Sequence, residues 1–294
     1  MTQHSQGEPV WVPTRDGRRL YAQLLPGPEP GCPTVVFEAG SGATRSSWSA
    51  VQHGVAPFTR AIVYDRAGLG HSEPDPESRT LDRMADDLCD VIDHFSRDNT
   101  GPFVLVGHSA GGPIVRLAAA RRPAEVRGLV LVDPTDEAAE MLFSTPFRVG
   151  EKVFLDIGKV LARLGVLPLL FDKQIDAVPE QDVREDLRNE GFTVGVLETQ
   201  ERQALTFLDE LEQWREHPPD LGDIPVTVIS GGLAADGMPE FVRHQMNASH
   251  LTRATHCARG KYVIARESGH LIPMTEPELI VREIRSLIVT LPTR

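Results

Sequence analysis

Short runs of apolar and β-branched residues recur along the chain, and longer amphipathic segments separate them. These runs occupy residues 35–37, 61–64, 103–106, 129–132, 226–229 and 262–264. Continuous apolar runs of this length are typical of strands in a parallel sheet that is covered on both faces. We therefore predict six buried strands.

The segments between the runs have a helical period. Residues 81–95 carry apolar side chains at positions 81, 84, 85, 88, 91, 92 and 95, which form one stripe on a helix. A second helix is predicted over 276–288, with Thr275 and Glu278 as a capping box and Pro277 in its first turn. The alternation of strands and helices predicts an α/β fold with a doubly wound, mostly parallel sheet flanked by helices.

Two further features interrupt or precede this alternation. Residues 11–13 and 19–25 are predicted to form an antiparallel hairpin, because an Asp-Gly turn lies between them. Residues 136–223 contain no clear strand and are rich in Leu, Phe, Glu and Arg. We expect them to form a helical cap inserted into a core domain made of residues 1–135 and 224–294. The apolar residues of this cap could roof a pocket or could pack the cap onto the sheet.

The charge and the cysteine content restrict the expected cellular compartment and the expected binding partners. The 294 residues include 42 acidic and 30 basic side chains, a formal charge of −12, so neither nucleic acid nor an anionic membrane is an expected partner. The widely spaced Cys32, Cys89 and Cys257 suggest neither a disulfide framework nor a zinc site, which favours a reduced, cytoplasmic compartment. The polar residues 1–10 predict no signal peptide, and the longest apolar stretch, 160–171, is too short to span a bilayer.

The strongest chemical signal is Gly107-His108-Ser109-Ala110-Gly111, a G-x-S-x-G motif between a predicted strand and a helix predicted over 114–121. In such a tight turn both glycines must lack side chains, and the serine projects at the carboxyl end of the sheet. The N–H of Ala110 would then lie at a helix N-terminus, where donors favour developing negative charge. Ser109 is therefore the candidate nucleophile.

A serine hydroxyl needs a base, and a carboxylate must orient that base. His270 is the best candidate base, since it follows the last predicted strand and precedes the last helix. Two carboxylates compete for the third position. Asp133 ends one predicted strand, and Asp236 lies in the loop after the next. Both are expected at the same edge of the sheet, so position along the chain leaves the two alternatives open.

A glycine-rich turn supplies the candidate second oxyanion donor. Glu38-Ala39-Gly40-Ser41-Gly42 follows the first buried strand, and we expect the Ser41 N–H to act together with that of Ala110. Asp65 and Arg66, which follow the next strand, are expected to brace the loops near Ser41.

Taken together, these motifs resemble the α/β-hydrolase family, and the match covers nearly the whole chain outside the cap. The resemblance rests on their order along the chain: Glu38-Ala39-Gly40-Ser41-Gly42, Tyr64-Asp65-Arg66-Ala67-Gly68-Leu69-Gly70-His71-Ser72, Gly107-His108-Ser109-Ala110-Gly111 and Ser268-Gly269-His270. By alignment, Ser41 inherits the oxyanion role, with Ala39-Gly40 where relatives often have His-Gly. Relatives usually carry the acid closer to the strand end than Asp236 lies, and some lipase-like members take it from the preceding strand. The resemblance therefore favours Asp133.

The residues predict acyl transfer to water through a covalent acyl-enzyme, with no metal and no organic cofactor. The expected partner is a small hydrophobic molecule with a carboxylic ester, thioester or lactone bond. Two other functions stay open: a biosynthetic acyltransferase or cyclase on the same scaffold, and a non-catalytic small-molecule receptor. Apolar residues in the cap also make a homodimer an expectation.

Overall fold

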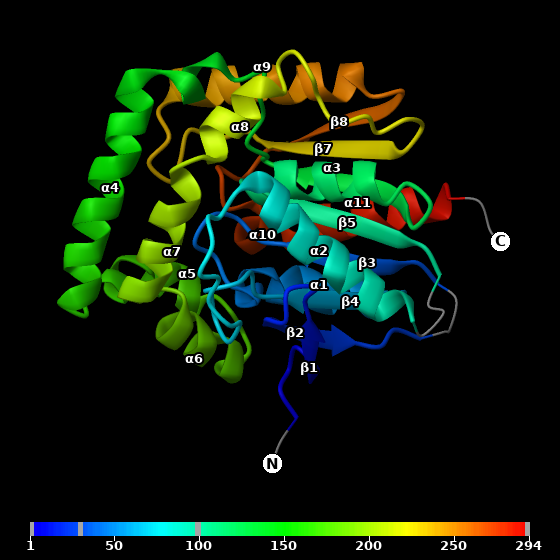
Figure 1. The fold of residues 1–294 in the computed structure, drawn as a ribbon, viewed down its shortest axis with the longest axis horizontal. Coiled ribbons are helices and arrows are strands. Elements are labelled where there is room, and N and C mark those ends of the chain that lie inside the picture. Colours follow the sequence, from blue (N-terminus) through cyan, green and yellow to red (C-terminus); the bar gives the residue numbers. More distant parts are fainter. Residues whose placement is uncertain (1–2, 29–31, 98–100, 292–294) are drawn as a thin grey trace.

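The computed structural model describes residues 3–28, 32–97 and 101–291. Its strands are β1 Glu8–Pro13, β2 Arg19–Leu25, β3 Thr34–Glu38, β4 Arg60–Tyr64, β5 Phe103–His108, β6 Val126–Val132, β7 Pro225–Gly231 and β8 Arg259–Ala265. They form one sheet in the order β1-β2-β4-β3-β5-β6-β7-β8 (Figure 1). The pairings of β2 with β1 and β4 are antiparallel, and all others are parallel. The predicted doubly wound, mostly parallel sheet is therefore confirmed, and so is the hairpin ahead of it.

Alternate residues of the central strands build two separate cores. In β5, Phe103 and Leu105 pack with helices α2 (Leu81–Ser96), α3 (Gly111–Arg121) and α9 (Glu240–His256). Val104 and Val106 point to the other face and pack with α1 (Ser49–Val55) and α11 (Pro277–Val289). Because both faces are covered, every residue of β5 is buried, which explains the unbroken apolar runs in the sequence.

Helix α2 agrees with its predicted range, and its start is capped by the Thr80 hydroxyl, which accepts a hydrogen bond from the Arg83 N–H. The capping box predicted for α11 is wrong. Thr275 ends the preceding short helix, α10 (Ile272–Thr275), and its hydroxyl donates to Ser268 Oγ instead. Glu276 takes the N-cap position of α11, without a side-chain capping bond.

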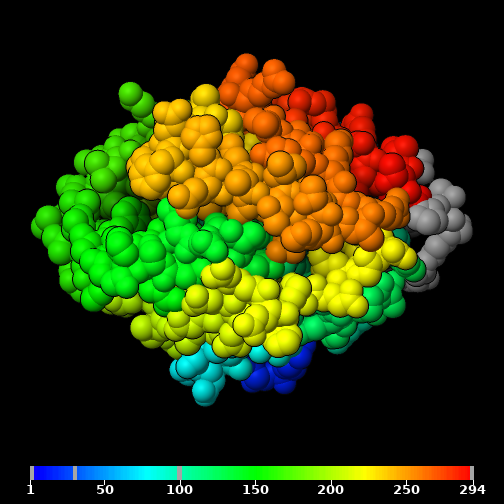
Figure 2. Space-filling view, turned by 90° about the horizontal axis from the view of Figure 1, so that it is seen from above, coloured from blue at the N-terminus to red at the C-terminus, as the bar shows by residue number. Residues whose placement is uncertain are grey.

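Between β6 and β7 the described residues form helices and no strand. The elements are η2 Glu140–Phe143, α4 Thr145–Arg163, η3 Leu167–Phe171, α5 Asp172–Asp176, α6 Gln181–Glu190, α7 Val194–Ala204 and α8 Phe207–Gln213. These helices lie at one end of the sheet (Figure 1), and the green residues that include α4 form one end of the molecule in Figure 2. The division of the chain into a core domain and a cap domain stays a prediction.

Helix α4 exposes a row of apolar side chains, at Val149, Val153, Ile157 and Val160, and Leu164 continues the row directly after the helix. Within the described ranges, no helix combines the length and the apolar character that crossing a bilayer requires.

The parallel strands bring the candidate residues to one edge. His108 pairs with Val132 in the register between β5 and β6, so Ser109 and Asp133 leave neighbouring strands at the same level. The loops after β3, β7 and β8 end at this edge too, and these loops contain Ser41, Asp236 and His270.

Candidate active site

The turn after β5 holds Ser109 in a strained backbone conformation. Its φ is 54°, in the left-handed region that non-glycine residues rarely adopt. A Cβ added at Gly107 would lie 2.5 Å from the Gly111 carbonyl oxygen, and one added at Gly111 would lie 2.5 Å from that of Glu38. The two glycines of the motif are therefore required by close backbone contacts on both sides of the serine.

His270 connects Ser109 with Asp133. Its Nε2 lies 3.0 Å from Ser109 Oγ, and its Nδ1 lies 2.6 Å from Asp133 Oδ2. A carboxylate can only accept, so Nδ1 carries the proton and Nε2 is left to accept the serine hydroxyl proton. The three side chains form a continuous chain of hydrogen bonds from the buried Asp133 carboxylate to the half-buried Ser109 hydroxyl.

Asp133 is fully buried and receives four hydrogen bonds. Its Oδ2 accepts from His270 Nδ1 and, at 2.9 Å, from Arg243 Nη2. Its Oδ1 accepts from Arg243 Nη1 at 2.5 Å and from the Gly231 N–H at 2.9 Å. Burial alone would raise the pKa of Asp133, but the hydrogen bonds from His270 and Arg243 hold it well below its usual range. Asp133 is therefore a fixed negative charge.

Asp236 serves a different part of His270. Its Oδ2 accepts from the backbone N–H groups of His270 at 2.8 Å and of Leu271 at 3.2 Å. No bond joins Asp236 to the imidazole. The structure thus brings Asp133 to the ring and Asp236 to the loop that carries the ring.

His108 points away from the Ser109 hydroxyl. Its Nε2 lies 2.9 Å from the His270 carbonyl oxygen, to which it donates. Burial, and then the nearby His270, lower the pKa of His108 to about 3, so its ring is neutral near pH 7. The neutral His108 ring therefore donates to the His270 carbonyl oxygen, whereas Asp236 accepts from the His270 N–H.

Ser41 and Ala110 both line the space beside Ser109. Neither N–H has a hydrogen-bond partner in the part of the chain that the structure describes. Arg66 braces the turn that carries Ser41, since its guanidinium donates to Glu38 Oε1 and to the carbonyl oxygens of Ala39 and Gly40.

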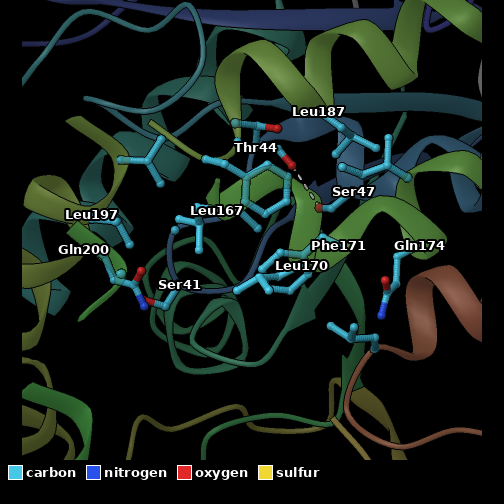
Figure 3. Close-up of a pocket in the computed structure, with 18 of the residues that line it drawn as sticks. Ser41, Thr44, Ser47, Leu167, Leu170, Phe171, Gln174, Leu187, Leu197 and Gln200 are labelled. Atoms are coloured by element: carbon cyan, nitrogen blue, oxygen red, sulfur yellow. Dashed lines mark hydrogen bonds between the residues drawn. The ribbon is translucent and has the colours of Figure 1, made fainter. Parts of the chain in front are cut away.

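Two cavities meet at Ser41. The larger has a volume of about 440 Å³ and lies between the loop after β3 and the segment from α4 to α7. Most of its lining is apolar, and Figure 3 shows Leu167, Leu170 and Phe171 grouped near Ser41 and Gln200. The smaller has a volume of about 150 Å³ and contains Ser109 itself. We call them the large cavity and the small chamber.

Among the described residues, no group of His, Cys, Asp and Glu side chains is arranged to hold a metal ion. Cys32, Cys89 and Cys257 are all unpaired.

Several residues around the site were not found from the sequence. Arg243 lies on α9, far from every motif, and only the fold brings its guanidinium to Asp133. His250, two turns further along α9, is fully buried, and its ring nitrogens contact Ser230 Oγ and the Pro134 carbonyl oxygen. Burial lowers the pKa of His250. No local sequence pattern marks either residue.

Comparisons with known proteins agree with the fold and the motifs. The sequence model of the "Alpha/beta hydrolase family" matches residues 35–283. An AB hydrolase superfamily protein of Gibberella zeae is 27% identical, over 88% of this chain and 87% of its own length. An esterase of Mycobacterium tuberculosis is also 27% identical, over 88% of this chain and 83% of its own. A thermophilic esterase from Thermogutta terrifontis superposes with a TM-score of 0.66 at 22% identity, covering 96% of this chain and 98% of its own.

Proposed function

Because this chain belongs to the alpha/beta hydrolase family, we propose that it is a serine hydrolase that cleaves an ester-like acyl bond. One observation carries the proposal: the unbroken hydrogen-bonded chain from Ser109 through His270 to Asp133. A hydroxyl, an imidazole with a fixed tautomer and a buried carboxylate are the parts that nucleophilic acyl transfer requires. The esterase relatives point the same way.

In the proposed reaction, Ser109 Oγ attacks the substrate carbonyl carbon while His270 Nε2 takes the hydroxyl proton. His270 then returns this proton to the leaving group, and an acyl-enzyme ester on Ser109 remains. Water, deprotonated by His270, attacks that ester, and His270 returns the proton to Ser109 Oγ as the acid leaves. In each half of the reaction Nε2 takes one proton from the attacking oxygen and gives it to the departing group, and no cofactor takes part.

Asp133 is the proposed triad acid. Its charge compensates the imidazolium that forms on His270, and its contact with Nδ1 keeps the ring in the reactive tautomer. Asp236 is assigned a positioning role, because it bonds to the backbone of His270 and Leu271 rather than to the ring.

The N–H groups of Ser41 and Ala110 are the proposed oxyanion hole. Both line the small chamber with Ser109, and both are free to donate. Donors that are aimed at a developing oxyanion before the reaction begins typically lower the barrier by about 2.7–4 kcal/mol each.

The large cavity supports a hydrophobic substrate, and residues 136–223 are proposed to act as a cap that roofs it. Phe154, Ile157 and Leu161 of α4 and Leu197 of α7 contribute to its wall, so the cap region and the loop after β3 enclose it together.

The test is pre-steady-state hydrolysis of p-nitrophenyl esters of increasing acyl length. A burst of p-nitrophenol equal to the enzyme concentration is expected, followed by slower steady-state release. Ser109→Ala should abolish both while leaving thermal unfolding nearly unchanged. Turnover retained by this variant would refute the nucleophile, and the absence of turnover at every chain length would refute ester hydrolysis.

A further inference from the structure

The small chamber has a polar wall that the proposed chemistry does not use. Apart from Ser41, Ser109 and Ala110, its lining includes Thr135, Glu151 of α4 and Gln203 of α7. The rest of its lining is apolar and comes from Leu142, Phe147, Ala204, Phe207 and Leu208.

Gln203 is the most informative of these polar residues. Only 4% of its surface is exposed, and its amide makes no hydrogen bond to the residues that the structure describes. The amide atoms are open to the chamber, where water or a bound group can reach them. A substrate group that displaces water there must offer the amide an equivalent hydrogen bond.

Glu151 faces the same space. Its carboxyl is partly buried and makes no hydrogen bond within the described ranges. Burial raises the pKa of Glu151, against a smaller opposite effect of Arg148, whose guanidinium pairs with Asp209 at 2.7 Å. The chamber thus offers a carboxyl and an amide, both unpaired, beside the nucleophile.

The two side chains together select a hydroxyl group. A hydroxyl can donate to Glu151 and accept from the Gln203 Nε2–H at the same time, whereas a methyl group can do neither. Burial raises the pKa of Glu151, which weakens its preference for an ammonium group over a neutral hydroxyl. The volume of about 150 Å³ admits a short group only.

We propose that the small chamber binds a short hydroxyl-bearing group on one side of the scissile bond, while an apolar chain on the other side fills the large cavity. This inference rests on the proposed function, because it places the reacting carbonyl at Ser109, between the two spaces. The substrate is then amphiphilic, with its polar and apolar parts separated by the bond that breaks.

Two pairs of esters test the proposal and show which side of the bond is polar. Hydroxyethyl decanoate and propyl decanoate differ by a hydroxyl against a methyl in the alcohol. Decyl glycolate and decyl propanoate differ in the same way in the acyl group. In at least one pair, kcat/KM should be about tenfold or more higher for the hydroxyl compound.

Gln203→Leu, which keeps the approximate size of the side chain, should reduce this preference to about twofold or less. The preference is a ratio of two kcat/KM values of the same variant, so it does not depend on the fraction of active protein, and an unchanged Tm shows that the fold is intact. Gln213→Leu is the matched control, because Gln213 is exposed at the end of α8. It should keep the full preference.

The outcomes separate this proposal from the one on which it rests. Equal kcat/KM within both pairs, or a hydroxyl preference that survives Gln203→Leu, would overturn the polar chamber. A normal burst with p-nitrophenyl esters but no turnover of any of the four esters would also overturn it. The absence of turnover of every p-nitrophenyl ester would instead refute the proposed ester hydrolysis.

Discussion

The pairing of Arg243 with Asp133 should be one of the largest single contributions to stability at the site. Both side chains are at least 97% buried, since Arg243 is 3% and Asp133 0% exposed, and two hydrogen bonds join them. In Arg243→Met the carboxylate keeps its His270 and Gly231 contacts but loses the compensating charge. Removing one partner of a buried ion pair typically costs about 3–5 kcal/mol. For a chain of this length, that corresponds to a fall in Tm of roughly 6–10 °C.

The pH dependence gives the sharper test. A carboxyl whose folded pKa lies below its unfolded value of about 3.9 contributes stability that is complete above that pH and is lost as the pH falls through the folded pKa. Asp133 is such a group, so its contribution to the unchanged protein should not vary between pH 7 and pH 5. Without Arg243, a proton bound by Asp133 or by the nearby His250 restores part of the missing charge.

The Tm difference between Arg243→Met and the unchanged protein should therefore narrow from pH 7 to pH 5, as measured by thermal unfolding in matched buffers. Arg282→Met, at an exposed position of α11, is the control and should shift Tm by no more than about 1–2 °C. A shift for Arg243→Met as small as that of the control, or one that is constant with pH, would refute the argument.

Two further comparisons follow from the geometry. Asp133→Asn should lower kcat by about 10⁴-fold because the amide disturbs the His270 tautomer, whereas Asp236→Asn should cost less than tenfold in steady-state ester hydrolysis; equal losses would contradict the assigned roles. Gly111→Ala should lower the free energy of unfolding by about 1–3 kcal/mol, because the added Cβ would meet backbone at 2.5 Å. Gly150→Ala, in open space on α4, should raise it by up to about 1 kcal/mol in the same denaturant titration, and a loss there would show that the helix argument fails.

The fold could be predicted because the central strands, β3 to β7, are covered on both faces, which leaves runs of apolar residues in the sequence. The strand at 262–264, which was predicted to be buried, lies in the edge strand β8 and is partly exposed. The capping box predicted at Thr275 was wrong because Thr275 can either end one helix or cap the next. Its hydroxyl donates to Ser268, seven positions away, and it therefore ends α10 rather than capping α11. Such a contact has no signature in the short window from which a cap is inferred.

Some residues of the candidate site could be predicted from the sequence and others could not. Ser109 and His270 each follow a strand and lie within a sequence motif, so their positions were predictable. The choice between Asp133 and Asp236 depends on which carboxylate reaches a ring and which reaches a backbone, and this is a matter of orientation rather than order along the chain. Arg243 and Gln203 lie on helices with no motif, and only tertiary packing brings them to the site.

The sheet edge holds the candidate triad, whereas the helices after β6 line the cavities. This separation has a consequence for how the protein can change. Within the described residues, the side chains of Ser109, His270 and Asp133 make hydrogen bonds only to one another, to the sheet edge and to α9. The walls of the large cavity and of the small chamber come mainly from residues of α4, α7 and their neighbours. Substitutions in residues 136–223 can therefore change the shape of both spaces without disturbing the groups of the proposed triad. Under the proposed function, selection for a new substrate could act on these helices while the triad stays unchanged.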